Sequence, residues 1–575
     1  MIQELMQYIK RHKWLYLLVF IALMVDYSLT IIPTMVTQRV IDAIAMQHLT
    51  VQLLNEQLLL LIVTTILFYI TEYIWIKYLY SSSSRFKFEL RMRLFNKLIR
   101  MRVPFYEKFR SGDMMTRFTN DINDVSELLG YGSMSLLFGL GTILFVVPAM
   151  FTISIEISLL AMLPIIILGV IVFYVGKWQE KAMEESREAV ASLSNEVLEV
   201  VEGIRVTRAY GKKELGASRF RKRTSELATK ANAIMKYGAI YGRIANTMLA
   251  ISTIIVLGVG GYYMQQGNLT LGKVVALQMY TLMLMEPMWV LSDFILVYQA
   301  SKVAFGKISE LLSTSDDMEE DGELILDQPE VIEFKNYDFK YANSEQNVLK
   351  QINIRLEKGK TLGIVGKTGS GKTTLVRQLL RQYPVGSGNL LINGQPVTDY
   401  QRSSVEAQIG YVPQEHILFS RTVQANIEVG KANASRKEID YSVAAASFTQ
   451  DLERMSEGYE TLVGEKGVSI SGGQKQRISI ARAFIKDPNV LILDDSLSAV
   501  DARTERIIIE NIQALRQGKT NIIVTHRLSA VNHADWVIVL DEGRIIEEGT
   551  PAQLLAQKGW YYEQHERQQL EGESA

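Results

Sequence analysis

The sequence predicts a multi-domain membrane protein, in which an all-α region of six membrane-spanning helices precedes an α/β domain with a phosphate-binding loop. Hydrophobic residues make up 48% of the 575 positions, and their long uninterrupted runs all lie in the first half. The second half instead alternates short apolar strands with helical patterns, as α/β domains do. The chain is also too long for a single hydrophobic core.

Composition excludes several kinds of chemistry. The chain has no cysteine, so disulfides, thiol nucleophiles and thiolate metal sites are excluded. Its net charge is −1, and we therefore expect no nucleic-acid partner. We predict no cleavable signal peptide, because the first apolar run is too long and lacks a cleavage site with small residues.

Six apolar runs are long enough to cross a bilayer, which takes about 20 residues in a helix. The third and fourth runs are separated by almost nothing around residues 152–154, which predicts a tight turn at the membrane surface. The predicted spans are Trp14–Val36, Leu54–Tyr80, Ser133–Ile153, Ile155–Val175, Asn246–Met264 and Val274–Tyr298.

Lysine and arginine predict the orientation of these spans, since positive residues concentrate on the cytoplasmic side. They precede the first span and fill the long loops between spans two and three and between spans four and five. The remaining loops carry almost none. We therefore expect the N-terminus, both long loops and the α/β domain to lie in the cytoplasm and the spans to lie in the cytoplasmic membrane. Both long loops have helical periodicity, which predicts that they extend the membrane helices.

Ionisable residues inside a membrane usually face a cavity or a partner. Those within the predicted spans are Asp26, Glu72, Lys77, Glu286 and Asp293. Glu286 and Asp293 are seven residues apart, hence on one helix face about 10 Å apart, and Met283 and Met288 lie close by. These four residues are candidates for a substrate cavity that accepts apolar or cationic molecules. Alternatively, the carboxylates pair with Lys77 or lie at a solvated helix end, and the methionines only pack.

A polar, acidic segment separates the two halves. Within residues 313–330, the short stretch 316–321 alone contains five acidic side chains, which predicts a solvated linker. The predicted organisation is a transmembrane domain at 1–312, the acidic linker at 313–330 and a nucleotide-binding domain at 331–575.

The phosphate-binding loop has the pattern G-x-x-x-x-G-K-[ST], which needs a preceding strand and a following helix. Residues 361–365 supply an apolar strand and residues 374–380 a helical pattern. Backbone N–H groups of such a loop surround phosphate oxygens at the start of the helix. The residues expected at the nucleotide are Gly366, Lys367, Thr368, Gly369, Ser370, Gly371, Lys372, Thr373 and Thr374.

Further motifs follow in a fixed order. Each is weak alone, because a lone glutamine, histidine or Ser-Gly-Gly is more often structural. Around the loop, Tyr341 ends a predicted strand and Gln414 follows a short one. Two acids, Asp494 and Asp495, end an apolar strand, as in the magnesium-aspartate arrangement of P-loop enzymes. The remaining candidates are Ser471, Gly472, Gly473 and Gln474 at a helix start, then Asp501 and His526.

Together these motifs resemble those of the ATP-binding-cassette (ABC) exporters, specifically half-transporters with six membrane helices and one nucleotide-binding domain. The resemblance covers essentially the whole chain. It implies the type IV exporter fold, with ATP and Mg²⁺ as cofactors. The resemblance identifies Gly366 to Thr373 as the Walker A motif and Asp494 as the Walker B acid. It also implies a dimer in which each ATP lies between the Walker motifs of one chain and the signature motif of the other.

The resemblance also implies roles for individual residues. Tyr341 would be the aromatic that stacks on adenine, and Ser471 to Gln474 the signature motif. Thr373, Gln414 and Asp494 would hold Mg²⁺, while Asp495, His526 and Gln414 would be the catalytic groups. Asp501 would be the acid of the D-loop.

Two positions depart from the family pattern. Ile470 precedes the signature where leucine is usual, and the second departure bears on catalysis. Asp495 stands where exporters normally carry the glutamate that polarises the attacking water. Its carboxylate is one methylene shorter, and a misplacement of about 1 Å can cost on the order of 100-fold in rate. The signature motif is intact. This combination predicts one half of a heterodimer, whose partner chain supplies the glutamate.

Other functions stay open at this level. A homodimer with slow turnover, an exporter of lipid or peptide, and a nucleotide-gated channel or regulatory subunit are the alternatives. The leading prediction is ATP-driven export of small hydrophobic compounds or drugs by a heterodimer in the lipid bilayer.

Overall fold

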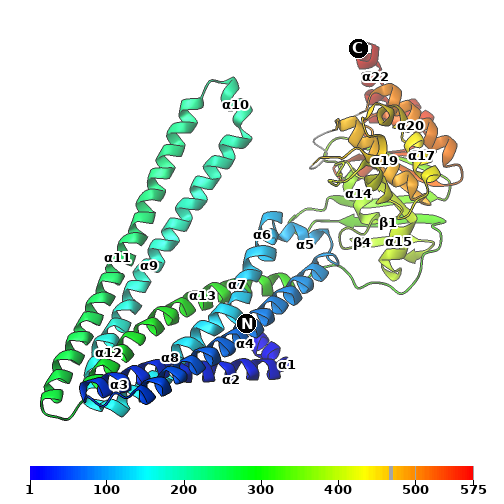
Figure 1. Ribbon diagram of the computed structural model, residues 1–575. Helices are drawn as coiled ribbons and strands as arrows, with labels where there is room; N and C mark the ends of the chain where they lie inside the picture. Colours follow the sequence, from blue (N-terminus) through cyan, green and yellow to red (C-terminus); the bar gives the residue numbers. More distant parts are fainter. Residues whose placement is uncertain (465–469, 499, 574–575) are drawn as a thin grey trace. The chain divides into compact units, whose positions relative to one another are not determined.

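The computed structural model describes residues 1–464, 470–498 and 500–573 and divides the chain into two compact units. Unit 1 contains residues 1–99 and 111–314, and unit 2 contains residues 100–110 and 315–575. Unit 1 is helical, and unit 2 is an α/β unit (Figure 1).

Unit 1 contains six helical stretches that are long and apolar enough to cross a membrane. Two short π-helical turns, 117–121 and 128–132, interrupt the third stretch. Its α-helices are α1 (Ile2–Arg11), α2 (Lys13–Thr30), α3 (Ile32–Ala45), α4 (Val51–Leu98), α6 (Ser111–Thr116), α7 (Ile122–Glu127), α8 (Ser133–Ile153), α9 (Ile155–Glu202), α10 (Ile204–Ala209), α11 (Lys213–Gln265), α12 (Leu271–Met283) and α13 (Met285–Ser313).

The six predicted spans are confirmed, and most continue as helices beyond their apolar stretches. α4 and α9 have 48 residues each and α11 has 53. The two long basic loops are therefore mostly helix, as their periodicity predicted. Between α8 and α9 the chain turns at the single residue Ser154, whose hydroxyl accepts a hydrogen bond from the N–H of Ile157 (3.4 Å) at the start of α9.

The first and last spans are each broken once, a feature that the apolar runs did not indicate. α2 passes into α3 at Ile31, next to Pro33, and α12 passes into α13 at Leu284, close to Pro287. Proline removes a helical N–H and favours such breaks. The Tyr280 hydroxyl of α12 donates to the backbone oxygen of Ile31 (3.3 Å), so the two broken helices are joined at this level.

α9 and α11 form a long antiparallel pair, connected at one end by α10 (Figure 1). α10 has no buried residue among those described. Several apolar side chains at this end are exposed, including Val201, Val206 and Tyr210. This end of the helical pair lies well beyond the apolar stretch that ends at Val175, and these apolar side chains are exposed within the described part of unit 1.

Unit 2 contains two sheets. The larger has the order β10-β9-β3-β8-β7-β6 and is parallel except for β10; the smaller, β2-β1-β4-β5, is antiparallel. The strands are β1 (Val331–Phe339), β2 (Leu349–Glu357), β3 (Thr361–Gly366), β4 (Ser387–Ile392), β5 (Gln395–Pro396), β6 (Ile409–Val412), β7 (Val490–Asp494), β8 (Thr520–Val524), β9 (Trp536–Asp541) and β10 (Arg544–Gly549).

Helices cover the parallel sheet, and the buried residues form two apolar clusters. The central strands β3, β7 and β8 are almost continuously buried, as expected for strands covered on both faces. The helices of unit 2 are α5 (Val103–Lys108), α14 (Lys372–Leu379), α15 (Arg402–Gln408), α16 (Val423–Glu428), α17 (Arg436–Ala445), α18 (Thr449–Arg454), α19 (Gly472–Ile485), α20 (Ala502–Leu515), α21 (Pro551–Gln557) and α22 (Trp560–Glu573).

Most side chains of the acidic segment 313–330 are exposed, and several residues of the segment also make specific contacts within unit 2. Asp317 forms an ion pair with Lys108 (2.5 Å) on the segment 100–110, and Asp321 accepts from the N–H of Arg402 (2.8 Å). Glu319 accepts from the N–H of Val385, and Leu326 is buried in the core of unit 2. The sequence did not indicate these contacts, because the basic and N–H groups lie far from the segment along the chain.

Candidate functional site

The phosphate-binding loop joins the central strand β3 to helix α14. Gly366 and Gly371 have φ angles of 143° and 103°, a region that favours glycine. A side chain at Gly366 would also meet the Leu540 backbone oxygen at 2.1 Å. The strand, loop and helix that the motif requires are therefore present, and the loop needs glycine for two separate reasons.

Lys372 begins α14, and its side chain folds back over the loop. Its Nζ donates to the backbone oxygens of Gly366 and Lys367, both at 2.8 Å. Burial lowers the pKa of the Lys372 ammonium, and the negative charges of Asp495 and Asp494 offset part of this effect. The ammonium thus lies within the loop, where it can exchange carbonyl partners for phosphate oxygens.

Thr373 and Asp494 come together as a set of hard oxygen donors. The Thr373 hydroxyl donates to Asp494 Oδ1 (3.0 Å), and the Tyr411 hydroxyl donates to Asp494 Oδ2 (3.1 Å). Asp494 ends β7 and is fully buried, and this burial raises the pKa of its carboxyl. The hydroxyl of Ser370 in the same loop is buried without a hydrogen-bond partner. Hydroxyl and carboxylate oxygens suit Mg²⁺, so these residues fit a magnesium-nucleotide.

Asp495 lies just beyond β7 in a left-handed conformation, with φ of 47°. Its N–H donates to the backbone oxygen of Val524 (2.8 Å), which fixes the residue to β8. His526 Nδ1 lies 2.8 Å from Asp495 Oδ1, and Gln414 Nε2 lies 3.4 Å from Asp495 Oδ2. Two of the residues expected to be catalytic, His526 and Gln414, therefore both contact the third, Asp495, although the three follow different strands.

The signature residues form the start of α19. The Ser471 hydroxyl accepts from the N–H of Gln474 (3.3 Å), and the Gln474 side chain accepts from the N–H of Ser471 (3.0 Å). Ser471 and Gly472 are exposed. In the described part of the chain, no hydrogen bond joins these residues to the phosphate-binding loop. The structure thus presents a capped, exposed helix start that can receive an anion from outside the chain.

Asp501 caps another helix. Its carboxylate accepts from the N–H groups of Arg503 (3.1 Å) and Thr504 (3.0 Å) at the start of α20. The Thr504 hydroxyl also donates to it, and this bond is the main reason why the pKa of Asp501 is lowered. Its role at a nucleotide stays a prediction.

Tyr341 is held edge-on by a second tyrosine that the sequence did not single out. The rings of Tyr341 and Tyr383 are 4.9 Å apart and nearly perpendicular, and the Tyr341 hydroxyl lies 3.0 Å from that of Thr374. The Tyr383 hydroxyl donates to Glu107 on α5. Tyr341 is half-buried, so one side of its ring packs against the core and the other side is accessible to a ligand.

Two site residues were missed because their partners are distant in sequence. Tyr411 lies within the strand that leads to Gln414. The alternation of side chains along this strand could have indicated that Tyr411 points toward Asp494 at the end of the neighbouring strand. Tyr383 follows α14 in a short loop, and no sequence signal linked it to Tyr341 or Glu107.

The candidates for a substrate cavity lie on either side of the break at Leu284. Met283 and Met288 are half-buried and pack against the core of unit 1, while Glu286 is exposed. Asp293 accepts from the Tyr131 hydroxyl (2.7 Å). Lys77 Nζ lies 5.4 Å from the ring centroid of Tyr73, and within the described residues neither carboxylate pairs with it. The expected pairing with Lys77 is therefore not present.

Two family models match the chain. The ABC transporter transmembrane region matches residues 16–288, and the ABC transporter model matches residues 349–498. The chain is also 41% identical over 510 residues to the probable multidrug resistance ABC transporter ATP-binding/permease protein YheI of Bacillus subtilis, covering 88% of this chain and 87% of that protein. The chain belongs to the ABC transporters.

Other relatives of this transporter span nearly its whole length. The multidrug resistance-like ATP-binding protein MdlA of Escherichia coli is 32% identical over 98% of this chain and 95% of its own. A solved bacterial Atm1-family ABC exporter with ATP bound has a TM-score of 0.76 at 23% identity, covering 97% of this chain and 99% of the other. The transporter therefore has the type IV exporter fold, with six membrane helices followed by an ATPase domain.

Proposed function

We propose that this transporter is one half of a heterodimeric exporter that uses ATP and Mg²⁺ to expel small hydrophobic compounds. Its ATPase domain and six spans are those of an ABC exporter, and its relatives carry multidrug resistance names. The further step to a heterodimer comes from one observation. Asp495 occupies the position of the water-polarising glutamate, while the signature Ser471 to Gln474 is intact.

The geometry supports ATP binding without efficient hydrolysis at this chain's own Walker site. Lys372 and the loop N–H groups would bind the phosphates, and Thr373 and Asp494 would hold Mg²⁺, which neutralises phosphate charge when bound. Asp495 is fixed through its backbone to Val524 and through its oxygens to His526 and Gln414. The side chain of Asp495 is one methylene shorter than that of glutamate, and both of its carboxylate oxygens have hydrogen-bond partners. The carboxylate therefore reaches the attacking water poorly.

A partner chain is also supported by the surface of unit 1. Val201, Val206 and Tyr210, near α10, are exposed and apolar, and they lie beyond the membrane stretch. Exposed apolar patches of this kind mark protein–protein contacts. The exposed signature serine likewise needs a second chain that brings ATP to it.

The proposed location is the cytoplasmic membrane, with the nucleotide-binding unit in the cytoplasm. The distribution of lysine and arginine supports this orientation. The candidates for the substrate cavity remain Glu286, Asp293, Met283 and Met288. They lie around the break between α12 and α13, where the helix can bend most easily.

Purification of the chain alone and together with the product of a neighbouring transporter gene tests the proposal. ATPase activity that appears only in the mixed dimer, and disappears when the partner's Walker B glutamate is replaced by glutamine, is the expected result. Equal activity of the chain alone would overturn the heterodimer. Stimulation by drugs, lipids or peptides then identifies the substrate class.

A further inference from the structure

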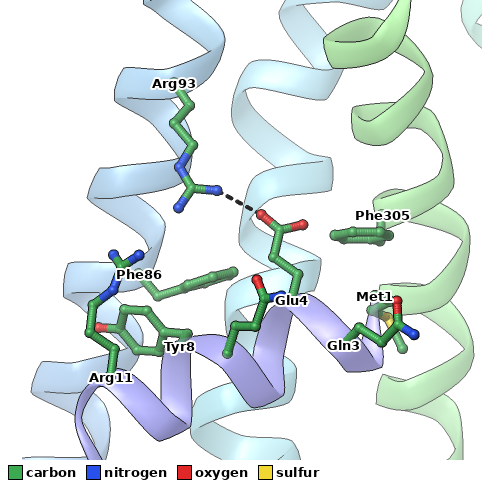
Figure 2. Close-up of a pocket in the computed structure, with 9 residues that line it drawn as sticks. Met1, Gln3, Glu4, Tyr8, Arg11, Phe86, Arg93 and Phe305 are labelled. Atoms are coloured by element: carbon green, nitrogen blue, oxygen red, sulfur yellow. Dashed lines mark hydrogen bonds and ion pairs between the residues drawn. The ribbon is translucent and has the colours of Figure 1, made fainter.

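A pocket of about 310 Å³ lies between α1, α4 and α13 in unit 1 (Figure 2). α1 packs on α4 through Tyr8, whose hydroxyl donates to the backbone oxygen of Ser82 (3.1 Å) and whose ring meets Phe86 edge-on at 5.0 Å. The opposite wall comes from Phe305 on α13. These contacts hold the first helix against two others and leave a hollow between them.

The pocket carries both signs of charge beside aromatic rings. Glu4 and Arg93 form an ion pair at 2.7 Å. Arg11 and Glu89 are further apart, at 3.8 Å, so their ion pair is weaker. Figure 2 shows the Glu4 carboxylate between Arg93 and the ring of Phe305, and Arg11 beside Phe86. A ligand that suits this lining has an anionic group for guanidinium and a cationic group for carboxylate and aromatic faces.

The pocket opens near the membrane surface. Its contact residue Ser82 comes two positions after the apolar stretch that ends at Tyr80, and α1 is followed directly by the first span. Trp14, at the start of that span, is 74% exposed, as an interfacial anchor would be. Arg11 is at the end of α1 that leads into the first span, and Glu4 is two turns earlier, about 10 Å away along the helix.

We propose that this pocket binds the headgroup of a phospholipid that carries a phosphate and a primary ammonium. The phosphate binds Arg11, because guanidinium matches phosphate geometry and Arg11 lies closest to the lipid. The ammonium binds Glu4 and the faces of Phe86 and Phe305. Arg11, next to the first span, would take the phosphate that adjoins the acyl chains, and Glu4 would take the terminal ammonium. A purely anionic headgroup would meet the Glu4 carboxylate.

Native mass spectrometry of the full-length transporter, in the oligomeric state in which it purifies, tests this site. Phosphatidylethanolamine and phosphatidylglycerol with the same acyl chains are titrated separately, and soluble phosphoethanolamine is added as a competitor. We expect tighter binding of phosphatidylethanolamine and only weak competition by the soluble headgroup. Preference for phosphatidylglycerol would overturn the proposal, and full displacement by phosphoethanolamine would assign the pocket to a soluble ligand instead.

Matched variants locate the binding. Arg11→Gln and Glu4→Gln should each weaken phosphatidylethanolamine binding roughly tenfold, the size of one charge-assisted hydrogen bond. Lys10→Gln and Arg91→Gln neutralise neighbouring residues that do not line the pocket and should have no effect. Gln7→Trp fills the pocket while both ion pairs remain, so it controls for loss of α1 docking. Unchanged binding in Gln7→Trp, or equal losses in the Lys10 and Arg91 variants, would contradict the site.

Discussion

At the scale of single residues, the proposal of an asymmetric exporter depends on Asp495. It has the charge of the usual glutamate but not its reach, and it is held by His526 at 2.8 Å and Gln414 at 3.4 Å. The rest of the Walker site is intact and well connected. Under the proposed function, this site would bind ATP and lack only the alignment of the attacking water.

Restoring the missing methylene should restore hydrolysis. In a mixed dimer whose partner glutamate has been replaced by glutamine, Asp495→Glu should raise the ATPase rate by up to about 100-fold, because the carboxylate regains about 1 Å of reach. Steady-state ATPase assays measure the change. Asp495→Asn, which keeps the length but removes the charge, is the control and should give no increase. An unchanged rate in Asp495→Glu would show that reach is not the limitation.

At the scale of secondary-structure elements, the start of α19 combines two roles in Ser471. Its hydroxyl caps the helix, and it would also face the partner's ATP. Ser471→Ala should lower the free energy of unfolding of the nucleotide-binding unit by about 1 kcal/mol and reduce ATPase activity. Ser471→Asp should keep the cap and the stability but still abolish activity, since its charge opposes phosphate.

A second helix offers a matched control for this experiment. Ser435 caps α17 with the same reciprocal arrangement, through Glu438. Ser435→Ala should cost similar stability in a denaturant titration and leave ATPase activity unchanged. If both serine variants lose activity to the same extent, the loss reflects stability and not contact with nucleotide.

The link from Tyr341 through Tyr383 to Glu107 joins the expected adenine platform to α5. Tyr383→Phe removes only the hydroxyl, so we expect the platform to loosen and ATP to bind about 2- to 10-fold more weakly, the range of one hydrogen bond. Tripolyphosphate, which has no base, should bind with unchanged affinity. Isothermal titration calorimetry measures both ligands.

A nearby pair separates this effect from general loosening of α5. Arg102 of the same segment forms an ion pair with Glu406 at 2.5 Å, and this pair does not involve the tyrosines. Glu406→Gln should therefore leave ATP affinity unchanged. If tripolyphosphate binding weakens in Tyr383→Phe, the tyrosine does not act through the base.

At the scale of the whole molecule, sequence predicted the spans and the order of nucleotide motifs because each depends on local pattern. Apolar runs specify membrane helices, and the glycine-rich loop specifies the turn from β3 to α14. Side-chain pairs distant in sequence could not be predicted. Neither the contact of Asp317 with Lys108 nor that of Tyr280 with Ile31 has a local signature. The contacts of the acidic segment were missed for this reason.

The absence of cysteine allows a direct test of the assembly. Val206 on α10 is 62% exposed, so Val206→Cys introduces one reactive thiol at the proposed contact with a partner. A bismaleimide should cross-link it to a cysteine placed in the nucleotide-binding domain of the partner chain, as gel electrophoresis would show. Val51→Cys, 76% exposed at the start of α4, is the control and should not cross-link. Equal yields at both positions would indicate random collision.

The helical pair α9 and α11 also has a mechanical consequence. α9 is 48 residues long, roughly 72 Å at the rise of an α-helix, and its apolar part occupies about 30 Å of that length. The remaining portion is a lever arm longer than the part within the bilayer. A force applied at α10 therefore acts with mechanical advantage. A displacement of several ångströms at α10 produces a smaller displacement, with greater force, in the part of the helical pair that lies within the bilayer.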